Sequence, residues 1–321
     1  MANKNKMRFC VVGCGNVAIK YGIEAIINSG VSELVVCVDH GIEKKEIIES
    51  RFGIPFELNL TDAINNYKFD AVYISTPTAF HKNAAIEAAK NGKHILCEKP
   101  LALNFSETES MLNAAKENNV ALFEGFMYQF HRQHIFVNQL IKENKIGEVF
   151  QINACFGYPQ RPEDDFRLNK EKGGGVLLDA GCYTLHFARN FFGEEPTEVS
   201  SVLNFKNNID LRGSVLLGFG KEKIAQLSFG MDNYYKNQYE LWGTKGAISV
   251  ERAFSVTNDY RPIITLETDS GKETFELDAD NHFVNEVRFF VNNHSLEKKR
   301  KEWYEETLLQ SELLERVGKK E

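Results

Sequence analysis

One short segment near the start of the chain restricts its possible folds more than any other. The apolar run Met7–Val12 is followed at once by Gly13-Cys14-Gly15-Asn16-Val17-Ala18, and a helical pattern then continues to about Asn28. Gly13 permits a tight turn after a buried strand, Gly15 lets the backbone approach a pyrophosphate, and Ala18 keeps the helix close to the strand. The phosphates of a dinucleotide are expected at the helix N-terminus, beside Asn16 and Val17. The alternative is a glycine turn with a purely structural role.

The first 125 residues alternate apolar runs with helical patterns. These runs are apolar without alternation, so both faces of each strand are expected to be covered. Strands that alternate with helices predict a doubly wound parallel sheet of the α/β class. The expected strands are Met7–Val12, Glu33–Val38, Ala71–Ser75, His94–Cys97 and Ala121–Glu124, and the expected helices are Val17–Asn28, Glu43–Phe52, Ala79–Asn91 and Phe105–Asn118.

The strand pattern changes after Phe126. Later segments place apolar and polar residues in alternation, as in Ala225-Gln226-Leu227-Ser228-Phe229. Period-two alternation predicts an open, mainly antiparallel sheet with one covered face. We therefore expect residues 1–125 to form a dinucleotide-binding Rossmann domain and residues 126–321 to form a substrate-binding and oligomerisation domain, which ends in an amphipathic helix near Glu302–Val317.

A carboxylate stands at the end of the second predicted strand. Asp39 can accept hydrogen bonds from the ribose hydroxyls of an adenosine, and its charge would repel a 2′-phosphate. We therefore expect NAD to be favoured over NADP, although Lys44 and Lys45 lie near enough in sequence to approach a phosphate. The alternative is that Asp39 only begins a turn.

The segment Ser75–His81 follows the third predicted strand. Its backbone is expected to border the dinucleotide at Thr76 and Pro77, with Pro77 shaping the loop. His81 is expected to begin the next helix near the cofactor site, and a direct chemical role for this histidine stays open.

Glu98-Lys99-Pro100 follows the fourth predicted strand. Ligands of an open parallel sheet lie beyond the carboxyl ends of its strands, and Pro100 keeps Lys99 out of the helical conformation. We therefore expect Lys99 to face the cofactor or the substrate, with Glu98 beside it at the cofactor site. The alternative is a surface lysine before a proline that begins a helix.

Three glycines, Gly173-Gly174-Gly175, lead into a predicted helix that carries Asp179 and Tyr183. At a spacing of four, the two side chains lie one turn apart on a face that His186 and Asn190 continue. A carboxylate and a phenol on one face are suited to proton transfer. The alternative is the half-exposed polar face of an ordinary surface helix.

Together these motifs resemble those of the Gfo/Idh/MocA family (glucose–fructose oxidoreductase, inositol dehydrogenase and rhizopine-catabolism proteins). The resemblance covers essentially the whole chain. It implies a Rossmann domain, a C-terminal α/β domain with an open, mainly antiparallel sheet, and hydride transfer between a nicotinamide and a carbon that bears a hydroxyl or a ketone, usually on a sugar. It rests on the Gly13 turn, on Gly92-Lys93-His94 before Glu98-Lys99-Pro100, and on Gly173–Gly175 before Asp179-x-Gly181-x-Tyr183.

Tyr183 stands where many members of that family have histidine, as in the branch that uses a tyrosine as acid and base. That branch includes dihydrodiol and xylose dehydrogenases and certain sugar ketoreductases. Phe166-Arg167 and the segment Tyr234–Gly246 further resemble nucleotide-sugar 3-ketoreductases, which implies substrate contacts for Phe166 and Arg167. Those proteins usually carry Tyr-Arg-Ser at Tyr235-Lys236-Asn237, and a lysine cannot form paired hydrogen bonds with a phosphate as arginine does.

The resemblance implies a mechanism that needs no metal. Tyr183 transfers the proton, Lys99 beside the nicotinamide hydrogen-bonds the same oxygen, and Asp179 orients the sugar. We expect an NAD(P)-dependent oxidoreductase of a sugar or sugar derivative, with a nucleotide-sugar ketoreductase as the specific form. The alternatives are a dehydrogenase of a free sugar or trans-dihydrodiol, an NAD-dependent glycosidase, and a redox-silent NAD-binding sensor.

Composition argues against several other classes of protein. The net charge of −7 disfavours nucleic acid as a partner, and the six cysteines lack the spacing of a metal site. The sequence shows no signal peptide and no apolar run long enough to span a bilayer, so a cytoplasmic location is expected. The half-covered sheet predicts a homodimer or homotetramer through the C-terminal domain.

Overall fold

The computed structural model describes residues 6–319 and divides into two compact units. The first unit contains the chain up to Met127 together with Phe283–Ser311. The second contains Tyr128–His282 and the residues from Glu312 onward. The predicted boundary near Gly125 lies beside the first of these divisions, whereas Phe283–Ser311, expected in the second domain, groups with the first unit.

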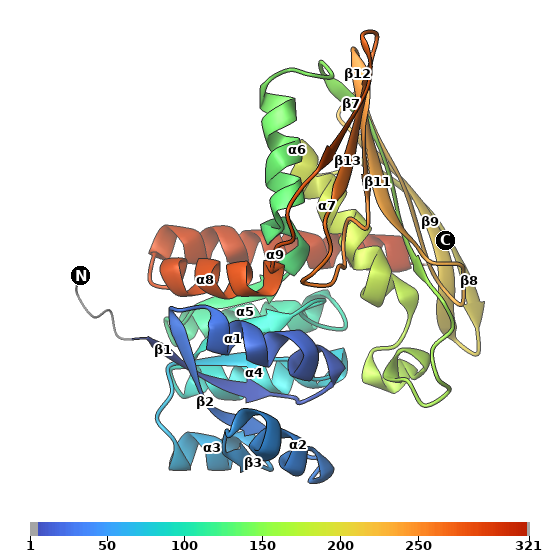
Figure 1. The fold of residues 1–321 in the computed structure, drawn as a ribbon. Coiled ribbons are helices and arrows are strands. Elements are labelled where there is room, and N and C mark those ends of the chain that lie inside the picture. Colours follow the sequence, from blue (N-terminus) through green and yellow to red (C-terminus); the bar gives the residue numbers. More distant parts are fainter. Residues whose placement is uncertain (1–5, 320–321) are drawn as a thin grey trace. The chain divides into compact units, whose positions relative to one another are not determined.

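The first unit is built on a six-stranded sheet in which all neighbouring strands run parallel (Figure 1). The strand order is β3-β2-β1-β4-β5-β6, so the direction of winding reverses between β1 and β4. Ligands of such sheets bind where the winding reverses, beyond the carboxyl ends of the strands. The predicted Rossmann fold is confirmed. The strands are β1 (Met7–Val12), β2 (Ser32–Val38), β3 (Phe56–Glu57), β4 (Ala71–Ile74), β5 (His94–Glu98) and β6 (Leu122–Gly125).

Helices cover both faces of this sheet. On one face, helix residues such as Ala85 and Met111 join the strand residues Val72 and Ile95 in one apolar cluster. Burial of this kind contributes about 25 cal/mol for each Å² of apolar surface removed from water. The helices of the N-terminal part are α1 (Ile23–Asn28), α2 (Glu43–Phe52), α3 (Leu60–Asn66), α4 (His81–Lys90) and α5 (Phe105–Glu117), with the short turns η1 (Ala18–Gly22) and η2 (Thr78–Phe80).

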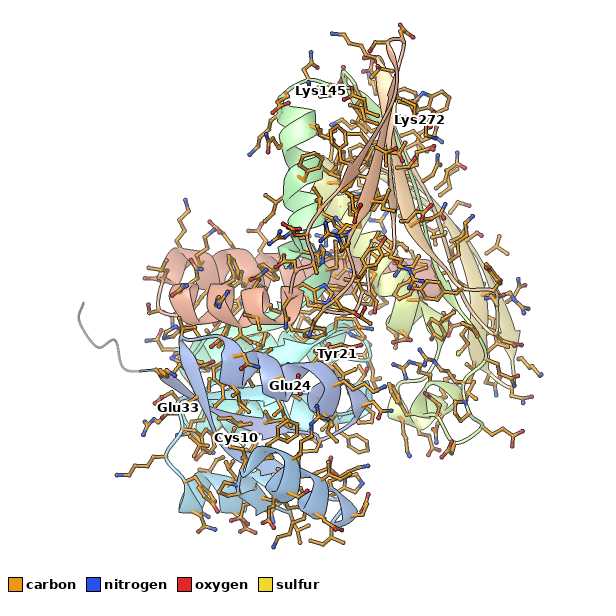
Figure 2. All side chains as sticks on the ribbon, in the orientation of Figure 1. Cys10, Tyr21, Glu24, Glu33, Lys145 and Lys272 are labelled. Atoms are coloured by element: carbon orange, nitrogen blue, oxygen red, sulfur yellow. The ribbon has the colours of Figure 1, made fainter. Side chains whose placement is uncertain are left out.

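Aromatic packing explains why Phe283–Ser311 belongs to the first unit. This segment lies in helices α8 (His282–Asn293) and α9 (Glu297–Gly318). Phe290 packs on Phe9 of β1, and Trp303 packs on Phe123 of β6. The ring of Tyr21, labelled in Figure 2, stacks on Phe283 with their centroids 5.0 Å apart.

The second unit is built on an eight-stranded sheet of order β14-β13-β12-β11-β7-β10-β9-β8. Within this sheet, as far as the structure describes the chain, only the pair β7 and β10 is parallel, so the predicted open, mainly antiparallel sheet is confirmed. The strands are β7 (Val149–Tyr158), β8 (Glu198–Lys206), β9 (Ile209–Phe219), β10 (Lys223–Met231), β11 (Lys236–Gly243), β12 (Gly246–Glu251), β13 (Ile263–Thr268) and β14 (Gly271–Glu276).

One face of this sheet packs against α6 (Arg132–Lys142) and α7 (Cys182–Phe192), as Figure 1 shows. Phe187 of α7 stacks on Tyr239 of β11 at 4.2 Å, and His134 of α6 lies against the same tyrosine. Along β11 the exposure alternates from residue to residue, so its other face is open to solvent in this chain. The remaining turns are η3 (Met127–Phe130), η4 (Phe166–Leu168), η5 (Lys170–Lys172) and η6 (Leu177–Gly181).

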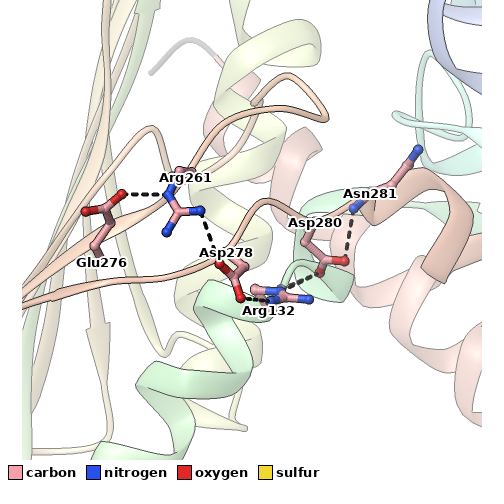
Figure 3. Close-up of polar contacts among 6 residues, drawn as sticks. All are labelled: Arg132, Arg261, Glu276, Asp278, Asp280 and Asn281. Atoms are coloured by element: carbon pink, nitrogen blue, oxygen red, sulfur yellow. Dashed lines mark hydrogen bonds and ion pairs between the residues drawn. The ribbon is translucent and has the colours of Figure 1, made fainter.

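A charged network fixes the segment that follows β14 (Figure 3). Arg261 donates to Glu276 and to Asp278, and Arg132 at the start of α6 forms ion pairs with Asp278 and Asp280. The backbone N–H of Arg132 also donates to Asp280, at 2.9 Å. The network therefore joins the start of α6 to the residues that lead into α8.

Within residues 6–319, no helix combines the length and the apolar character needed to cross a bilayer.

Candidate functional site

The glycine-rich turn of the first unit is tightly enclosed at Gly13. This residue has φ of +94°, and a Cβ on it would lie 2.6 Å from the backbone nitrogen of Thr76. No larger residue fits between the ends of β1 and β4. Gly15 is exposed, and the nearest atom to a Cβ there would be the Ser75 carbonyl oxygen, 4.0 Å away. The turn is therefore closed on its inner side and open at Gly15, as the approach of a pyrophosphate requires.

Asp39 follows β2, and both of its carboxylate oxygens accept backbone hydrogen bonds. Oδ2 accepts from Cys14 N–H at 2.7 Å, and Oδ1 accepts from Gly41 N–H at 2.8 Å. The carboxylate therefore joins the glycine-rich turn to the loop after β2. A carboxylate oxygen has two lone pairs, so these bonds leave room for ribose hydroxyls as further donors.

The loop after β4 carries Thr76 and Pro77. Thr76 Oγ1 is buried and has no hydrogen-bond partner among the residues that the structure describes. A buried hydroxyl without a hydrogen-bond partner lowers the stability of the folded chain by about 1–3 kcal/mol, unless a ligand or a water forms a hydrogen bond with it. Such an atom beside Gly13 fits a site that is completed by a dinucleotide.

His81 is 1% exposed and joins two loops. Its Nε2 lies 2.8 Å from the Thr76 carbonyl oxygen, and its Nδ1 lies 3.1 Å from that of Pro100 and 3.2 Å from that of Leu101. Burial lowers the pKa of His81, while the carbonyl oxygens oppose this shift. The ring therefore lies between the loop after β4 and the loop that follows Lys99, and in its neutral form the single N–H donates to a carbonyl oxygen of one of these loops.

β5 ends at Glu98, one residue beyond the predicted strand, and Lys99 follows it directly. Glu98 is buried, and its Oε1 accepts from the Tyr73 hydroxyl at 2.5 Å. Lys99 is half-buried, and the Lys99-Pro100 peptide bond is cis. The N–H of Leu101 donates to Glu124 Oε1 at 2.8 Å, which anchors the far side of the loop.

In the second unit, the three glycines lead into a π-helical turn rather than directly into an α-helix. Residues Leu177–Gly181 form η6, and α7 begins at Cys182. Gly175 has φ of +122°, and a Cβ on it would lie 2.1 Å from Asp210 Oδ1. Asp210 Oδ2 accepts from Leu177 N–H at 2.6 Å, so Asp210 fixes the start of the turn that carries Asp179.

Asp179 is held by two donors on a single oxygen. Its Oδ2 accepts from the Tyr158 hydroxyl at 2.5 Å and from Arg167 Nε at 2.7 Å. Arg167 also pairs with Asp165 and lies over the ring of Phe166, 4.6 Å from its centroid. Burial and the charge of Asp179 raise the pKa of Tyr158 well above its usual range, so this hydroxyl remains a donor. The structure thus brings the predicted residues Phe166, Arg167 and Asp179 together.

Tyr183 is 5% exposed and lies among other aromatic rings. Its ring packs against those of Phe156, Tyr128 and Phe254, with centroid distances of 5.5, 5.9 and 6.2 Å. The alternative of a half-exposed polar face is wrong, because Tyr183 and His186 are buried and only Asn190 of that stripe is exposed.

His186 lies within hydrogen-bond distance of Tyr128, with 2.8 Å between Nδ1 and the hydroxyl oxygen. Burial lowers the pKa of His186 well below its usual value, so the ring is neutral at pH 7. This contact places His186 beside Tyr128 in the aromatic wall around Tyr183.

The segment that follows β10 presents aromatic and basic side chains. Tyr234 is 93% exposed, and the guanidinium of Arg252 lies between the rings of Tyr235 and Tyr260, at 5.2 and 5.7 Å. Asn237 is buried and accepts from Phe254 N–H, so it supports the backbone rather than a ligand. Lys236 is exposed beside it.

Sequence reasoning missed several residues that support the site. Tyr158 gave no signal because it ends a strand far from Asp179 in sequence. Tyr73 looked like an ordinary apolar residue of a buried strand, and Glu286 lies in α8, which was not predicted.

The residues of the glycine-rich turn fit NAD(P). The evidence for this fit is the closed inner side at Gly13, the open side at Gly15 and the unpartnered Thr76 hydroxyl. Gly13, Gly15, Asp39 and Thr76 would hold the dinucleotide on the first unit.

Comparison with known proteins agrees with both units. Residues 7–126 match the family model described as "Oxidoreductase family, NAD-binding Rossmann fold", and residues 134–249 match the "GFO/IDH/MocA C-terminal domain". The chain is 31% identical over 318 residues to a dTDP-3,4-didehydro-2,6-dideoxy-alpha-D-glucose 3-reductase from Actinomadura kijaniata, covering 98% of this chain and 96% of the relative. It is 26% identical to D-xylose 1-dehydrogenase (NADP(+)) 2 from Haloferax volcanii, covering 89% and 88%.

Among solved structures, a 3-ketoreductase from Actinomadura kijaniata in complex with NADP and TDP-benzene has a TM-score of 0.91 and 30% identity, covering 98% of this chain and 97% of that one. The same ketoreductase has also been solved with a Tyr→Phe and with a Lys→Ala replacement. By near-full-length similarity and by two matching domain models, this chain belongs to the Gfo/Idh/MocA family of NAD(P)-dependent oxidoreductases.

Proposed function

We propose that this oxidoreductase reduces a keto carbon of a nucleotide-linked sugar. The observation that carries the proposal is the near-full-length similarity to dTDP-sugar 3-reductases, joined to a matching pair of reactive residues. The lysine and tyrosine replaced in the related ketoreductase are separated by the same number of residues as Lys99 and Tyr183. These two positions are therefore the best candidates for the chemistry in this chain.

In the proposed reaction, the keto carbon would receive a hydride from a reduced nicotinamide once that cofactor is bound. The Tyr183 hydroxyl donates its proton to the sugar oxygen, which becomes a hydroxyl, and the reverse direction uses tyrosinate as the base. The Lys99 ammonium donates a hydrogen bond to the same oxygen and offsets the negative charge that develops there. A positioned proton donor of this kind contributes about 10²–10⁴ in rate.

Asp179 is proposed to accept a hydrogen bond from a neighbouring sugar hydroxyl. The hydrogen bonds that Tyr158 and Arg167 donate to Asp179 support this role, because a carboxylate fixed by two donors is oriented before the sugar binds. Phe166 and Arg167 are proposed to border the sugar.

Further binding groups are proposed at the end of the eight-stranded sheet where β7 ends and β11 begins. Tyr234 and Tyr235 offer rings there, and Arg161 and Arg252, which lie over the rings of Tyr158 and Tyr235, offer cations. Aromatic rings suit a nucleobase, and the cations suit a diphosphate.

The proposed cofactor is NAD in preference to NADP. The carboxylate of Asp39 at the end of β2 supports this choice, since it would repel a 2′-phosphate. The NADP in the related ketoreductase counts against it, so the ratio of kcat/KM for the two cofactors decides the matter.

A homodimer or homotetramer through the second unit is also proposed. The open face of the eight-stranded sheet carries the exposed apolar side chains Val202, Leu216, Ile224 and Trp242 among mostly uncharged neighbours. Exposed apolar patches of this kind mark contact surfaces.

The experiment is a nicotinamide absorbance assay with NADH and NADPH against three pools: free sugars, sugar phosphates, and nucleotide-linked keto sugars. Turnover only with the nucleotide-linked pool, absent in a Lys99→Met variant, is the expected result. Equal turnover with free sugars would reject the nucleotide-linked substrate.

A second candidate is oxidation of a free sugar or diol. Lys236 stands where the nucleotide-sugar 3-ketoreductases that this segment resembles usually have arginine. The chain is also similar to the xylose dehydrogenase of Haloferax volcanii over most of that protein's length. Turnover of NAD with the free-sugar pool would favour this candidate.

A further inference from the structure

One buried carboxyl group of the first unit has no role in the proposed hydride transfer. Glu286 of α8 is 1% exposed, and its Oε1 has no hydrogen-bond partner within residues 6–319. A charged carboxylate without partners is very costly in such surroundings, whereas a protonated carboxyl is tolerated.

The surroundings of Glu286 include the strand end that carries Lys99. Glu98 and Gly125 are register partners in β5 and β6, and a Cβ on Gly125 would lie 3.4 Å from Glu286 Oε1. Tyr73 donates to Glu98 and is itself influenced by the charge of Glu286. The carboxyl of Glu286 therefore lies within van der Waals contact of the position that a Gly125 Cβ would take, directly beside the register partner of Glu98.

Two titratable groups face Glu286 from the sheet: Glu98 from β5 and Tyr73 from β4. Burial, and then the charge of Glu98, raise the pKa of Glu286 well above its usual value. Gly125 presents no side chain from β6, and Glu124 instead accepts from Leu101 N–H. Two carboxyl groups close together in a dry site cannot both ionise, and the hydroxyl of Tyr73 favours the charge on Glu98.

We propose that Glu286 is a positioning residue that keeps its proton at neutral pH, so that a single negative charge, on Glu98, fixes the end of β5. This inference rests on the proposed role of Lys99, because Lys99 follows Glu98 directly in the chain. A second negative charge on Glu286 would repel Glu98 and displace the lysine. Small displacements of a reacting group cost about 10²-fold in rate.

The first test needs no substrate. Infrared spectra of the wild type and of E286Q are compared at pH 7, with E24Q as a control for a partly exposed glutamate that is paired with Arg51. The expected result is a C=O stretch of a protonated carboxyl that disappears in E286Q and persists in E24Q. Its absence from the wild type at pH 7 would overturn the proposal, whatever substrate the enzyme uses.

The second test follows kcat across pH for E286Q and E286A. Because glutamine is neutral and similar in shape, E286Q is expected to keep the kcat of the wild type at pH 7. At alkaline pH, the fall in kcat that ionisation of Glu286 causes in the wild type is expected to be absent from E286Q. E286A is expected to lower kcat by about tenfold to hundredfold with KM little changed. If E286A does not fold, the E286Q profile alone decides. An alkaline limb identical to that of the wild type would contradict the proposal.

Discussion

At the scale of single residues, the site depends on carboxylates whose oxygens are fixed by defined donors. Asp39 is held by two backbone N–H groups, Asp179 by Tyr158 and Arg167, and Glu98 by Tyr73. Charge-assisted hydrogen bonds of this kind are about twice as strong as neutral ones, so the carboxylates are oriented before a ligand binds. The sequence indicated the three carboxylates, and the fold supplies their donors.

Replacing Asp39 by asparagine is expected to shift cofactor preference. D39N removes the charge that repels a 2′-phosphate while keeping one oxygen acceptor for Cys14 or Gly41. The ratio of kcat/KM for NADP over NAD should rise by about tenfold, which corresponds to ~1.4 kcal/mol. Steady-state kinetics with both cofactors measure this ratio, and an unchanged ratio would show that Asp39 only shapes the turn.

Removing the Tyr158 hydroxyl is expected to weaken sugar binding. Y158F keeps the ring but removes the hydroxyl donor, so that of the two donors to Asp179 Oδ2 only Arg167 remains. A hydrogen bond to a charged group contributes about 1.5–3 kcal/mol, so KM for the sugar should rise about tenfold or more while cofactor affinity is kept. Y67F, which alters a partly exposed tyrosine of the first unit, is the matched control. Equal KM values in Y158F and the wild type would remove Asp179 from the binding role.

At the scale of elements, the glycines before the π-turn decide how Asp179 is presented. The turn Leu177–Gly181 lies between Gly175 and α7, and Gly175 is conformationally required as well as sterically enclosed. By contrast, Gly193 ends α7 in a left-handed conformation, and a Cβ added there would meet no atom within 4 Å. A substitution at Gly193 therefore tests the cost of the backbone conformation alone, whereas one at Gly175 tests that cost together with the cost of a steric clash.

The variants G175A and G193A are expected to differ in stability. G193A should cost about 1 kcal/mol, because its left-handed φ is the only strain. G175A adds a Cβ at 2.1 Å from Asp210 Oδ1 and should cost several times as much, with loss of sugar binding. Urea unfolding of both variants measures the difference. Equal midpoints would show that the turn relaxes freely.

The elements that the sequence predicted best are a continuous apolar run, β1, and a helical segment between two glycines, α2. The predictions of β1 and α2 match the observed bounds. Elements that were missed are short or follow weak signals: β3 has two residues, and α3 begins with an asparagine cap at Asn59 that was not recognised. The π-turns η1 and η6 could not be predicted, because tertiary contacts select them over an ordinary α-helix.

The site could be predicted only in part for a related reason. Motifs mark residues that lie next to one another in sequence, such as Glu98 and Lys99. Their supports come from distant strands and helices, as with Tyr73 for Glu98 and Tyr158 for Asp179. Only the fold brings such pairs together.

At the scale of the whole molecule, buried histidines make the protein sensitive to acid. Burial lowers the pKa of His134 and His282 to about 3 and that of His94 to about 4. These groups are neutral in the folded chain and protonate near pH 6.5 when unfolded. Their contribution to stability is therefore complete above about pH 6.5 and is lost as the pH falls toward the folded values.

The melting temperature is expected to fall between pH 7 and pH 5. Each of these histidines should lose on the order of 2 kcal/mol over that interval. H134Q removes one titrating group and should make the fall smaller, whereas H40Q, at an exposed position, should not. Calorimetry at both pH values measures the effect, and equal falls in H134Q and the wild type would contradict it.

The open face of the eight-stranded sheet gives a second prediction at this scale. Trp242 is 49% exposed there, and Trp242 and Ile224 both pair with Gln151 of β7, one from each side. W242R is expected to convert the proposed oligomer to a monomer, because a desolvated charge in an apolar contact is strongly unfavourable. I42R, at an exposed position of the first unit, is the control. Light scattering after gel filtration reports the mass, and a wild type that is already monomeric would reject the proposed interface.

The central claim is that Lys99 and Tyr183 serve one hydride transfer. The most direct measurement is the single-turnover rate of NAD(P)H oxidation with a nucleotide-linked keto sugar, in the wild type and in K99M and Y183F, with cofactor affinity measured in parallel. The account predicts a loss of about 10²–10⁴ in rate in each variant, with cofactor binding unchanged. Turnover at the wild-type rate in either variant would contradict it.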